Sequence, residues 1–468
     1  MTEMLSKYFE TVEKTDPVKY SGRVVKVQGL LIESRGPRAV IGEICRIEAP
    51  RGRGIIHAEV VGLRDETVQL MAYEETGGIE AGCRVVASGS PLEIPVSDKL
   101  LGRVLDCRGN PVDGKGGIDA VLRYPALADP PEAATRPRIL RRLSTGIRSI
   151  DGLLSVGRGQ RIGIFAGSGV GKTTLLGMIA RNTNADVNVV ALIGERGREL
   201  NDFIANDLGP AGLARSVLVA TPSNSPPLAR LRGAYTATAV AEYFRDQGLD
   251  VMLLFDSVTR FARAQREIGL ASGEPPATRG YTPSVFDSMP KLLERSGTSG
   301  KGSITGFYTV LVEGDDMDEP IADTVRGILD GHIVLSRRLA RAYHYPAVDV
   351  LESVSRLMPA VSGPVTNKAA GCIRRLMADY AGAEDLINVG AYHTGTNPAI
   401  DEAIAKREAI ESLLIQEVEE KSSMAETLKI MADIAGMEIP PEEIGIYERE
   451  TAAGTGGIPA PGIGYETL

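Results

Sequence analysis

The residues best suited to chemistry form a short glycine-rich segment, AGSGVGKT, at positions 166–173. It follows the apolar run RIGIF and precedes TLLGMIARN, so a strand, a tight loop and a helix are expected in that order. Small residues let successive backbone N–H groups turn inward, and the helix N-terminus adds positive potential. This arrangement suits a polyphosphate, with Lys172 reaching the β- and γ-phosphates and the Thr173 hydroxyl holding Mg²⁺.

The segment departs from the usual motif at its first position, where alanine replaces glycine. Ala166 must therefore avoid the left-handed backbone conformations that glycine permits. A chance glycine turn is the alternative interpretation, and the combination of strand, Gly-Lys-Thr and helix disfavours it. The residues expected around the phosphates are Gly167, Ser168, Gly169, Val170, Gly171, Lys172, Thr173 and Thr174.

Two acidic residues stand where predicted strands end. Asp256 closes the run VMLLFD, the usual place of an acid that holds the metal through water. Glu195 follows VNVVALIG and would face the same crevice, because parallel sheets bind ligands at the C-terminal ends of their strands. A carboxylate there can orient the attacking water, and Arg196 can contact the γ-phosphate or structure the loop. Taken alone, Asp256 is equally compatible with a helix cap, and Glu195 with a loop salt bridge.

The elements that must position these residues can be predicted from the pattern of apolar, polar and glycine residues along the chain. Apolar strands alternate with helical patterns over 143–357, which predicts a parallel sheet covered on both faces. Short β-rich runs separated by glycine turns over 21–94 predict a small barrel or sandwich. The stretch 102–142 is predicted to be a loop draped over the next domain. Helical text follows, including one long stretch over 399–435.

Length and composition fit a protein of two or three domains. The chain has 468 residues, against a usual domain of about 150 residues. The 52 Lys and Arg against 61 Asp and Glu give a net charge of −9, which disfavours a nucleic-acid coat. A basic run at 136–142 lacks interleaved aromatics, so no nucleic-acid partner is expected. The cysteines show no paired metal-binding spacing, and reduced thiols are expected: Cys45, Cys83, Cys107 and Cys372.

Neither a signal sequence nor a membrane span is recognisable. The first twenty residues lack an apolar signal core, and no later run reaches the ~18 apolar residues that cross a bilayer. The protein is expected to stay inside the cell, with docking on a membrane complex still possible. Met4, Leu5, Tyr8, Phe9 and Val12 form a helical stripe that faces either a partner or its own domain.

Several longer segments carry a resemblance to a known family. They are GSGVGKTTLL, GERGRE, LLFDSVTRFARAQREI, GEPPATRGYTPSVFDSMPKLLERSG, EGDDMDEPIADTVRGILDGHIVLSR and YPAVDVLESVSR. In this order they resemble the rotary-type hexameric ATPases, and most of all the flagellar type III protein export ATPases, which are related to the F-type ATP synthase α and β subunits. The resemblance extends over nearly the whole chain, as far as NVGAYHTGTNPAIDEAI.

The resemblance implies roles for individual residues. Glu195 becomes the catalytic carboxylate, with Lys172 and Arg196 beside it, and Asp256 the Walker B acid. Tyr345 becomes the ring that packs beside adenine. Arg356 becomes an arginine finger that reaches into a neighbouring subunit's site, where such a residue stabilises γ-phosphoryl charge. Without the flanking motifs, Tyr345 would be interpreted as a core ring and Arg356 as a surface residue.

The resemblance also implies the architecture and the partners. It predicts a RecA-like P-loop core with an N-terminal small β-barrel domain and a C-terminal α-helical domain, assembled as a homohexamer that hydrolyses ATP to ADP with Mg²⁺. Expected partners are a stator-like regulator on the N-terminal helix, a central stalk protein, the export gate, export substrates and their chaperones. The protein is then cytoplasmic and sits at the cytoplasmic face of the inner-membrane export apparatus.

The predicted boundaries are a partner-binding helix at 1–20, the barrel at 21–95, the ATPase domain at 96–360, the helical domain at 361–440 and a flexible tail at 441–468. Four alternatives stay open: an injectisome ATPase, an F- or V-type ATP synthase catalytic subunit, a non-catalytic nucleotide-gated scaffold and a Rho-like nucleic-acid motor. Lys172, Glu195 and Arg356 in one chain disfavour the scaffold, and the acidic balance disfavours the motor.

Overall fold

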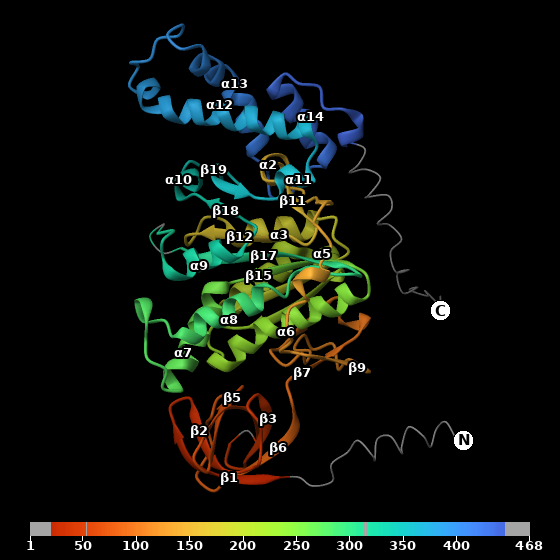
Figure 1. Cartoon of the computed structure of the whole chain (residues 1–468), viewed down its shortest axis with the longest axis vertical. Helices are drawn as coiled ribbons and strands as arrows, with labels where there is room; N and C mark the ends of the chain where they lie inside the picture. The colour runs from red at the N-terminus through yellow and green to blue at the C-terminus, as the bar shows by residue number, and fades with distance from the viewer. Residues whose placement is uncertain (1–19, 53, 313, 315, 445–468) are drawn as a thin grey trace, which may run out of the picture.

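The computed structural model describes residues 20–52, 54–312, 314 and 316–444. Three parts follow one another along the long axis: a barrel at one end, an α/β body in the middle and a helical part at the other end (Figure 1). The fold class predicted from the sequence is thereby confirmed. The proposed helix at 1–20, apart from its last residue, and the tail beyond 444 lie outside the described residues.

The barrel is closed, with the strand order β1-β2-β5-β4-β3-β6. Inward and outward residues alternate with period two, and in β3 Cys45, Ile47 and Ala49 are fully buried. This alternation supplies a small core of aliphatic side chains inside the barrel. The strands are β1 (Ser21–Gln28), β2 (Leu31–Arg35), β3 (Glu43–Ala49), β4 (Gly54–Arg64), β5 (Thr67–Ala72) and β6 (Arg84–Pro91).

The central sheet has the order β19-β18-β12-β17-β15-β13-β14-β8. Neighbouring strands run parallel except for β19, which pairs antiparallel with β18, and β16, which pairs antiparallel with β17. The strands are β8 (Arg103–Leu105), β12 (Arg161–Ala166), β13 (Val187–Ile193), β14 (Ser216–Thr221), β15 (Asp250–Asp256), β16 (Gly297–Thr298), β17 (Ser303–Leu311), β18 (Gly331–Leu335) and β19 (Val348–Ser355). Two small ribbons join β7 (Glu93–Val96) to β9 (Leu122–Pro125) and β10 (Arg142–Leu143) to β11 (Val156–Gly157).

The stretch 102–142, predicted to be a loop-rich connection, also contains the strands β8 and β9, and β8 joins the central sheet. Arg103 pairs with Val217 and extends the sheet beyond β14. The strand is three residues long, too short for an alternating pattern to show in the sequence. The Asp113 carboxylate holds it in place, accepting hydrogen bonds from Arg103 Nε at 2.7 Å and Val104 N at 3.1 Å.

Helices cover both faces of the sheet, as predicted. Leu253 and Phe255 of β15 pack on one side with Phe261, whereas Leu254 packs on the other side with Leu176. The helices are α2 (Arg148–Leu153), α3 (Lys172–Asn182), α4 (Gly197–Asp202), α5 (Gly209–Ala214), α6 (Pro227–Asp246), α7 (Val258–Ala271), α8 (Pro283–Leu293), α9 (Pro320–Ile328), α10 (Arg337–Arg341), α11 (Met358–Val361), α12 (Pro364–Asn388), α13 (Pro398–Leu414) and α14 (Met424–Ala435). None of the helices in the described part of the chain is long and apolar enough to cross a bilayer.

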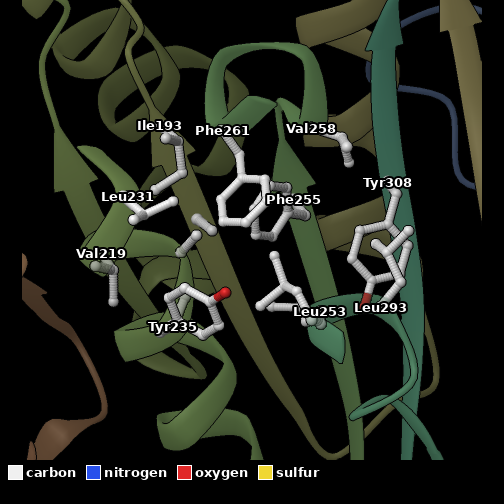
Figure 2. Packing of buried hydrophobic residues seen from close by; sticks show 14 of the residues in the cluster. Ile193, Val219, Leu231, Tyr235, Leu253, Phe255, Val258, Phe261, Leu293 and Tyr308 are labelled. Carbon is white, nitrogen blue, oxygen red and sulfur yellow. The ribbon is translucent and has the colours of Figure 1, made fainter. Parts of the chain in front are cut away.

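Aromatic pairs organise the larger of the two faces (Figure 2). The Tyr235 and Phe261 rings meet edge to face with centroids 5.8 Å apart. Phe255 and Tyr308, on neighbouring strands, lie 5.6 Å apart. Such pairs contribute roughly 0.5–1.5 kcal/mol each beyond the burial of their area. The second pair links β15, which ends at Asp256, to its neighbour β17.

The long helical stretch predicted over 399–435 is interrupted. It is divided into α13 and α14 by a nine-residue connection, 415–423. Ser423 starts α14 with a capping box, in which its hydroxyl accepts from Glu426 N and its own N–H donates to the Glu426 carboxylate. The Ser-x-x-Glu pattern that marks this start is present in the sequence, inside the predicted stretch.

A buried ion pair joins the barrel to the α/β body. Arg232 on α6 donates from Nε to Glu59 Oε2 of β4 at 2.8 Å, and its second N–H forms an ion pair with the same carboxylate. The Tyr73 hydroxyl donates to Glu59 Oε2 at 2.6 Å, and burial raises the Tyr73 pKa well above its ordinary value. Glu59 is 2% exposed, so its charge depends on these two partners.

We expect Glu59→Ala to lower the free energy of unfolding by about 3–5 kcal/mol, because it leaves the Arg232 charge buried and unpaired. Calorimetric melting of the variant would measure the loss. Replacing both partners together, Glu59→Met with Arg232→Met, should be less destabilising than the single change.

The matched control is Arg51→Ala in the same barrel. Arg51 pairs with Glu80 at 3.3 Å, but its side chain is 80% exposed, so the melting temperature should stay nearly unchanged. A Glu59→Ala protein that melts with the wild type would show that the buried pair does not hold the junction.

Candidate nucleotide-binding site

The glycine-rich segment forms a loop between β12 and α3, as the sequence predicts. Ala166 is the last residue of β12 and is 1% exposed, so it never has to adopt a left-handed conformation. Gly171, which precedes α3, has φ of 85°, a conformation that favours glycine. A Cβ at Gly167 would stand 2.5 Å from Arg337 Nε, so a side chain there would require the Arg337 guanidinium to move.

Lys172 is the first residue of α3 and lies between two acids. Its Nζ is 2.5 Å from Asp256 Oδ1 and 3.7 Å from Glu195 Oε1. The Thr309 hydroxyl of β17 donates to the same Asp256 oxygen at 2.7 Å. The Asp256 side chain is 2% exposed and lies beneath the lysine, so it can reach a metal in the cavity only through an intervening group such as water.

The Glu195 carboxyl lies in the loop that follows β13, with 14% of its side chain exposed. Burial raises its pKa to about 7, and the nearby Asp256 charge acts in the same direction. A hydrogen bond with Glu199 also favours the protonated form, whereas Lys172 favours the charged form. Near neutral pH this carboxyl is therefore poised between the two states, which suits a group that must accept a proton or orient water.

A cavity of about 620 Å³ opens over the loop, and most of the charged side chains that line it are basic. Five basic residues face two acidic ones, Glu195 and Glu199, so the lining favours a polyanion. The basic residues are Lys172, Arg196, Arg260, Arg263 and Arg337. Arg196 is the most open of those predicted, with 75% of its side chain exposed and an ion pair to Glu199 at 3.4 Å.

The same cavity fits Mg²⁺ only together with a nucleotide. Across the residues that the structure describes, no group of three or more His, Cys, Asp or Glu side chains is placed to hold a metal ion by itself. Thr173, which lines the cavity, and Asp256 are too few to complete the octahedral shell that Mg²⁺ requires. The remaining ligands would be phosphate oxygens and water, as is usual for Mg²⁺ bound with a nucleotide.

Tyr345 stands beside the phosphate loop, where the resemblance places a base-packing ring. Its Cδ1 and Cε1 atoms are 3.5 Å from the position that a Cβ on Gly171 would take. A second hollow of about 440 Å³ lies between the loop residues 168–170, Arg341 and the Tyr345 ring. Tyr343 meets Tyr345 edge to face, with centroids 5.7 Å apart, and is 86% exposed.

Arg356 is the one predicted residue that the structure keeps apart from the others. It follows β19, whose antiparallel pairing places Ser355 opposite Gly331, the first residue of β18. Its own N–H donates to Asp330 O at 3.1 Å. β18 is parallel to β12, so Arg356 is exposed near the N-terminal ends of these strands, whereas the phosphate loop of the same chain follows the C-terminal end of β12. We call these the two opposite edges of the sheet.

Sequence reasoning missed five polar or charged residues of the site: Glu199, Arg260, Arg263, Thr309 and Arg337. Thr309 stands inside a buried strand, where nothing in the sequence marks it as a partner of Asp256. Arg337 is the last residue of the segment EGDDMDEPIADTVRGILDGHIVLSR quoted for the resemblance, and its position over Gly167 depends on a fold that only the structure supplies.

Family models match each of the three parts. The nucleotide-binding domain of the ATP synthase alpha/beta family matches residues 146–355, and the beta-barrel domain of that family matches 24–89. A model described as the T3SS EscN ATPase C-terminal domain matches 364–433. The fold and the phosphate-binding cavity thus define a nucleotide-binding protein, and the chain belongs to the ATP synthase alpha/beta family.

Relatives narrow this to one group of the family. A flagellum-specific ATP synthase of Treponema pallidum is 58% identical over 445 residues, which cover 95% of this chain and 99% of the relative. A type 3 secretion system ATPase of Xanthomonas euvesicatoria is 48% identical over 413 residues, covering 88% and 93%. The chain belongs to the flagellum-specific ATP synthases and type III secretion ATPases, and it is an ATP-hydrolysing enzyme.

Solved structures of type III secretion ATPases superpose on this chain. The assembled ATPase EscN from the type III secretion system of enteropathogenic E. coli superposes with a TM-score of 0.84 at 44% identity, over 88% of this chain and all of that one. EscN in complex with its central stalk EscO gives a TM-score of 0.83, with the same identity and coverage.

The pKa of Glu195 leads to a prediction about pH. If its carboxylate is the active form, kcat/KM for ATP should rise as pH increases through about 7 and fall up to tenfold per unit below it. Glu199→Gln removes the charge on the group whose hydrogen bond favours protonated Glu195, so the acid limb should move to lower pH. Steady-state hydrolysis measured across a pH series would locate the limb.

The companion variant is Glu195→Gln, which has no titratable group at this position. It should bind nucleotide and lose roughly 10²–10⁴-fold in turnover. An acid limb that stays in place in Glu199→Gln, or full turnover in Glu195→Gln, would contradict the assignment.

Proposed function

We propose that the chain is the ATP hydrolase of the flagellar type III protein export apparatus and acts as a homohexamer whose sites are shared between neighbouring subunits. The observation that carries this proposal is the separation of Arg356 from the phosphate loop at opposite edges of one sheet. A ring of identical subunits in head-to-tail contact brings the Arg356 edge of one subunit against the cavity of the next.

The side chains divide the reaction between them. Glu195 orients water toward the γ-phosphate, and Lys172 leaves its two acidic partners to contact the β- and γ-phosphates. Arg196 and the neighbour's Arg356 stabilise the charge that spreads over the γ-phosphoryl oxygens. Thr173 and Asp256 would hold Mg²⁺, which neutralises phosphate charge when bound. The Tyr345 ring packs beside the adenine.

The flagellar system is favoured over the injectisome by the relatives. Identity is 58% to the flagellum-specific enzyme of Treponema pallidum and 48% to the type 3 secretion ATPase of Xanthomonas euvesicatoria. The injectisome is the second candidate, because the C-terminal model and the superposed structures come from EscN. The complex of EscN with EscO supports a central stalk partner for this chain as well.

The remaining partners follow the same proposal. A stator-like regulator binds the N-terminal segment 1–20, and the export gate, substrates and chaperones meet the ring at its helical end. The enzyme works in the cytoplasm, at the cytoplasmic face of the inner membrane. An F- or V-type catalytic subunit is less well supported, because the relatives are export ATPases over 88–95% of this chain.

Mixed rings test the shared site. Arg356→Ala alone should hydrolyse ATP roughly 10³–10⁵ times more slowly, and Lys172→Ala alone should also be inactive. When the two variants are assembled together at equal amounts, about one quarter of the sites combine an intact loop with an intact arginine. Activity should recover to that fraction, with the ring confirmed by mass measurement.

The control mixes Lys172→Ala with Glu195→Gln. Both residues line the cavity of the same chain, so no combination of these two subunits completes a site and activity should stay low. Equal recovery in both mixtures, or none in the first, would refute action between subunits.

Deletion of the gene in its own bacterium tests the cellular role. We expect loss of flagellar filaments and motility, restored by the wild-type gene and not by Glu195→Gln. Electron microscopy and swimming assays measure this outcome. Normal filaments together with loss of secretion by an injectisome would favour the second candidate.

A further inference from the structure

The connection between α13 and α14 returns from the helical part to the nucleotide-binding body. Gln416, the second residue of this connection, is 3% exposed. Its backbone N–H donates to the carbonyl oxygen of Tyr345 at 2.9 Å. A segment of the helical domain is thus hydrogen-bonded directly to the backbone of the proposed base-packing residue.

The Gln416 side chain is fixed by three hydrogen bonds. Its Oε1 accepts from Arg148 N at 2.9 Å. Its Nε2 donates to Gly146 O at 2.8 Å and to Glu420 O at 3.0 Å. Both ends of a buried amide are therefore occupied, which leaves this side chain a single orientation.

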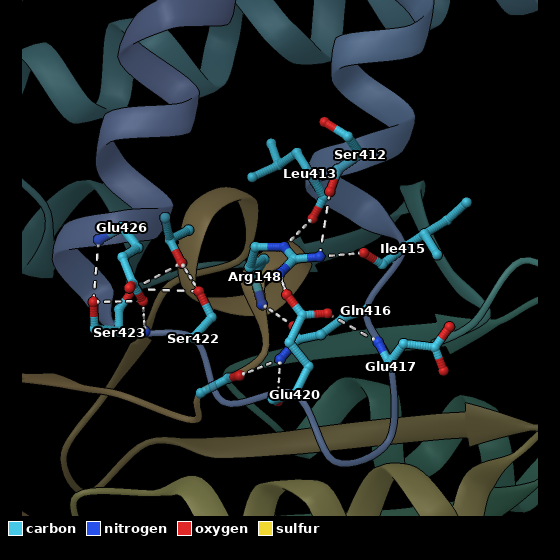
Figure 3. Close-up of polar contacts among 12 residues, drawn as sticks. Arg148, Ser412, Leu413, Ile415, Gln416, Glu417, Glu420, Ser422, Ser423 and Glu426 are labelled. Atoms are coloured by element: carbon cyan, nitrogen blue, oxygen red, sulfur yellow. Dashed lines mark hydrogen bonds and ion pairs between the residues drawn. The ribbon is translucent and has the colours of Figure 1, made fainter.

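Arg148, on α2 of the nucleotide-binding body, binds the same connection through its side chain (Figure 3). Its guanidinium donates to Leu413 O at 3.2 Å, to Ser412 O at 3.3 Å and to Ile415 O. These carbonyls end α13 and have no partner within the helix. An ion pair joins the guanidinium to Glu420, so one buried side chain binds both ends of the turn.

The surface under Gln416 is rigid. Asp151 accepts hydrogen bonds from Thr145 N at 2.8 Å and Gly146 N at 2.9 Å, which fixes the turn that presents Gly146 O. Arg181, near the end of α3, donates to Val418 O at 2.7 Å. The connection therefore touches the helix that begins with Lys172 and the residue that flanks the phosphate loop at Gly171.

We propose that Gln416, held by Arg148, is a positioning residue for Tyr345, so that the affinity for ATP depends on how the connection 415–423 is seated on the nucleotide-binding body. The proposal rests on ATP being the substrate and on Tyr345 packing beside its base. It makes a specific demand: loss of Gln416 weakens the recognition of the base and leaves the recognition of the phosphates intact.

Gln416→Ala in the full-length assembly is the direct test. KM for ATP should rise about tenfold with kcat nearly unchanged, the pattern of lost binding that is equal in ground and transition states. The inhibition constant of inorganic triphosphate, which has no base, should stay at its wild-type value. Tyr345→Ala should behave in the same way. The double variant should be no worse than Tyr345→Ala, because Gln416→Ala acts only through the Tyr345 ring, by unseating the connection whose backbone N–H bonds Tyr345 O.

The matched control is Glu443→Ala, which loosens the helical part elsewhere. The Glu443 carboxylate accepts from Val365 N at 3.0 Å and Thr366 N at 2.9 Å at the start of α12, so its hydrogen bonds serve α12 and not the connection. KM for ATP should not change in this variant. Should Gln416→Ala fail to fold, Glu420→Gln removes the charge that pairs with Arg148 from a side chain that is 39% exposed, and KM should rise by a smaller factor.

Three results would overturn the inference: an unchanged KM for ATP, an equal weakening of ATP and triphosphate, or additive effects of Gln416→Ala and Tyr345→Ala. These results are distinct from failure of the proposed function. A wild-type protein that hydrolyses no ATP would refute the proposed function itself. An active wild type with an impaired Tyr345→Ala and an unaffected Gln416→Ala would sink this inference alone.

Discussion

Strand direction in the central sheet is the constraint on which the rest of the molecule depends. β12, β13 and β15 run parallel, so their C-terminal ends bring the phosphate loop, Glu195 and Asp256 to one edge. β19 runs the other way and delivers Arg356 to the opposite edge. A six-residue strand such as β12 is about 20 Å long, farther than any side chain reaches. Under the proposed function, the two halves of the site would therefore belong to different copies of the chain.

At the edge of the sheet that carries the phosphate loop, the charged side chains are arranged around Lys172. Its ammonium group lies between Asp256 and Glu195, which keeps two acids close together in a largely buried place. A nucleotide that draws this lysine toward its phosphates also removes the partner that favours ionised Glu195, so phosphate binding and the protonation of Glu195 are linked through one side chain. The basic cavity lining compensates by offering the phosphates other cations.

The sequence alone predicts those parts of the fold and of the site in which function imposes a local pattern of residues. The phosphate loop, the acid at the end of β15 and the alternation of strands and helices all follow from spacing that short segments display. Strand β8 was missed because three residues carry no period, and the break at 415–423 because Ile415 and Val418 carry the helical apolar spacing into its first half. Thr309 and Arg337 join the site only through long-range packing, and the role of Gln416 depends on partners some 70 to 270 positions away.

The Arg232 and Glu59 pair has a consequence for how a ring of such subunits could move. A charge pair this deeply buried cannot open without exposing both ions to an apolar surrounding, so the barrel and α6 behave as one rigid body. The opposite end is joined differently: the Glu420 side chain is 39% exposed, and the other acceptors of the Arg148 guanidinium are neutral carbonyl groups, so only one of the two ions there is deeply buried. Differences in shape between subunits at successive stages of ATP turnover would accordingly be concentrated at the helical end, while the barrels keep a constant radius.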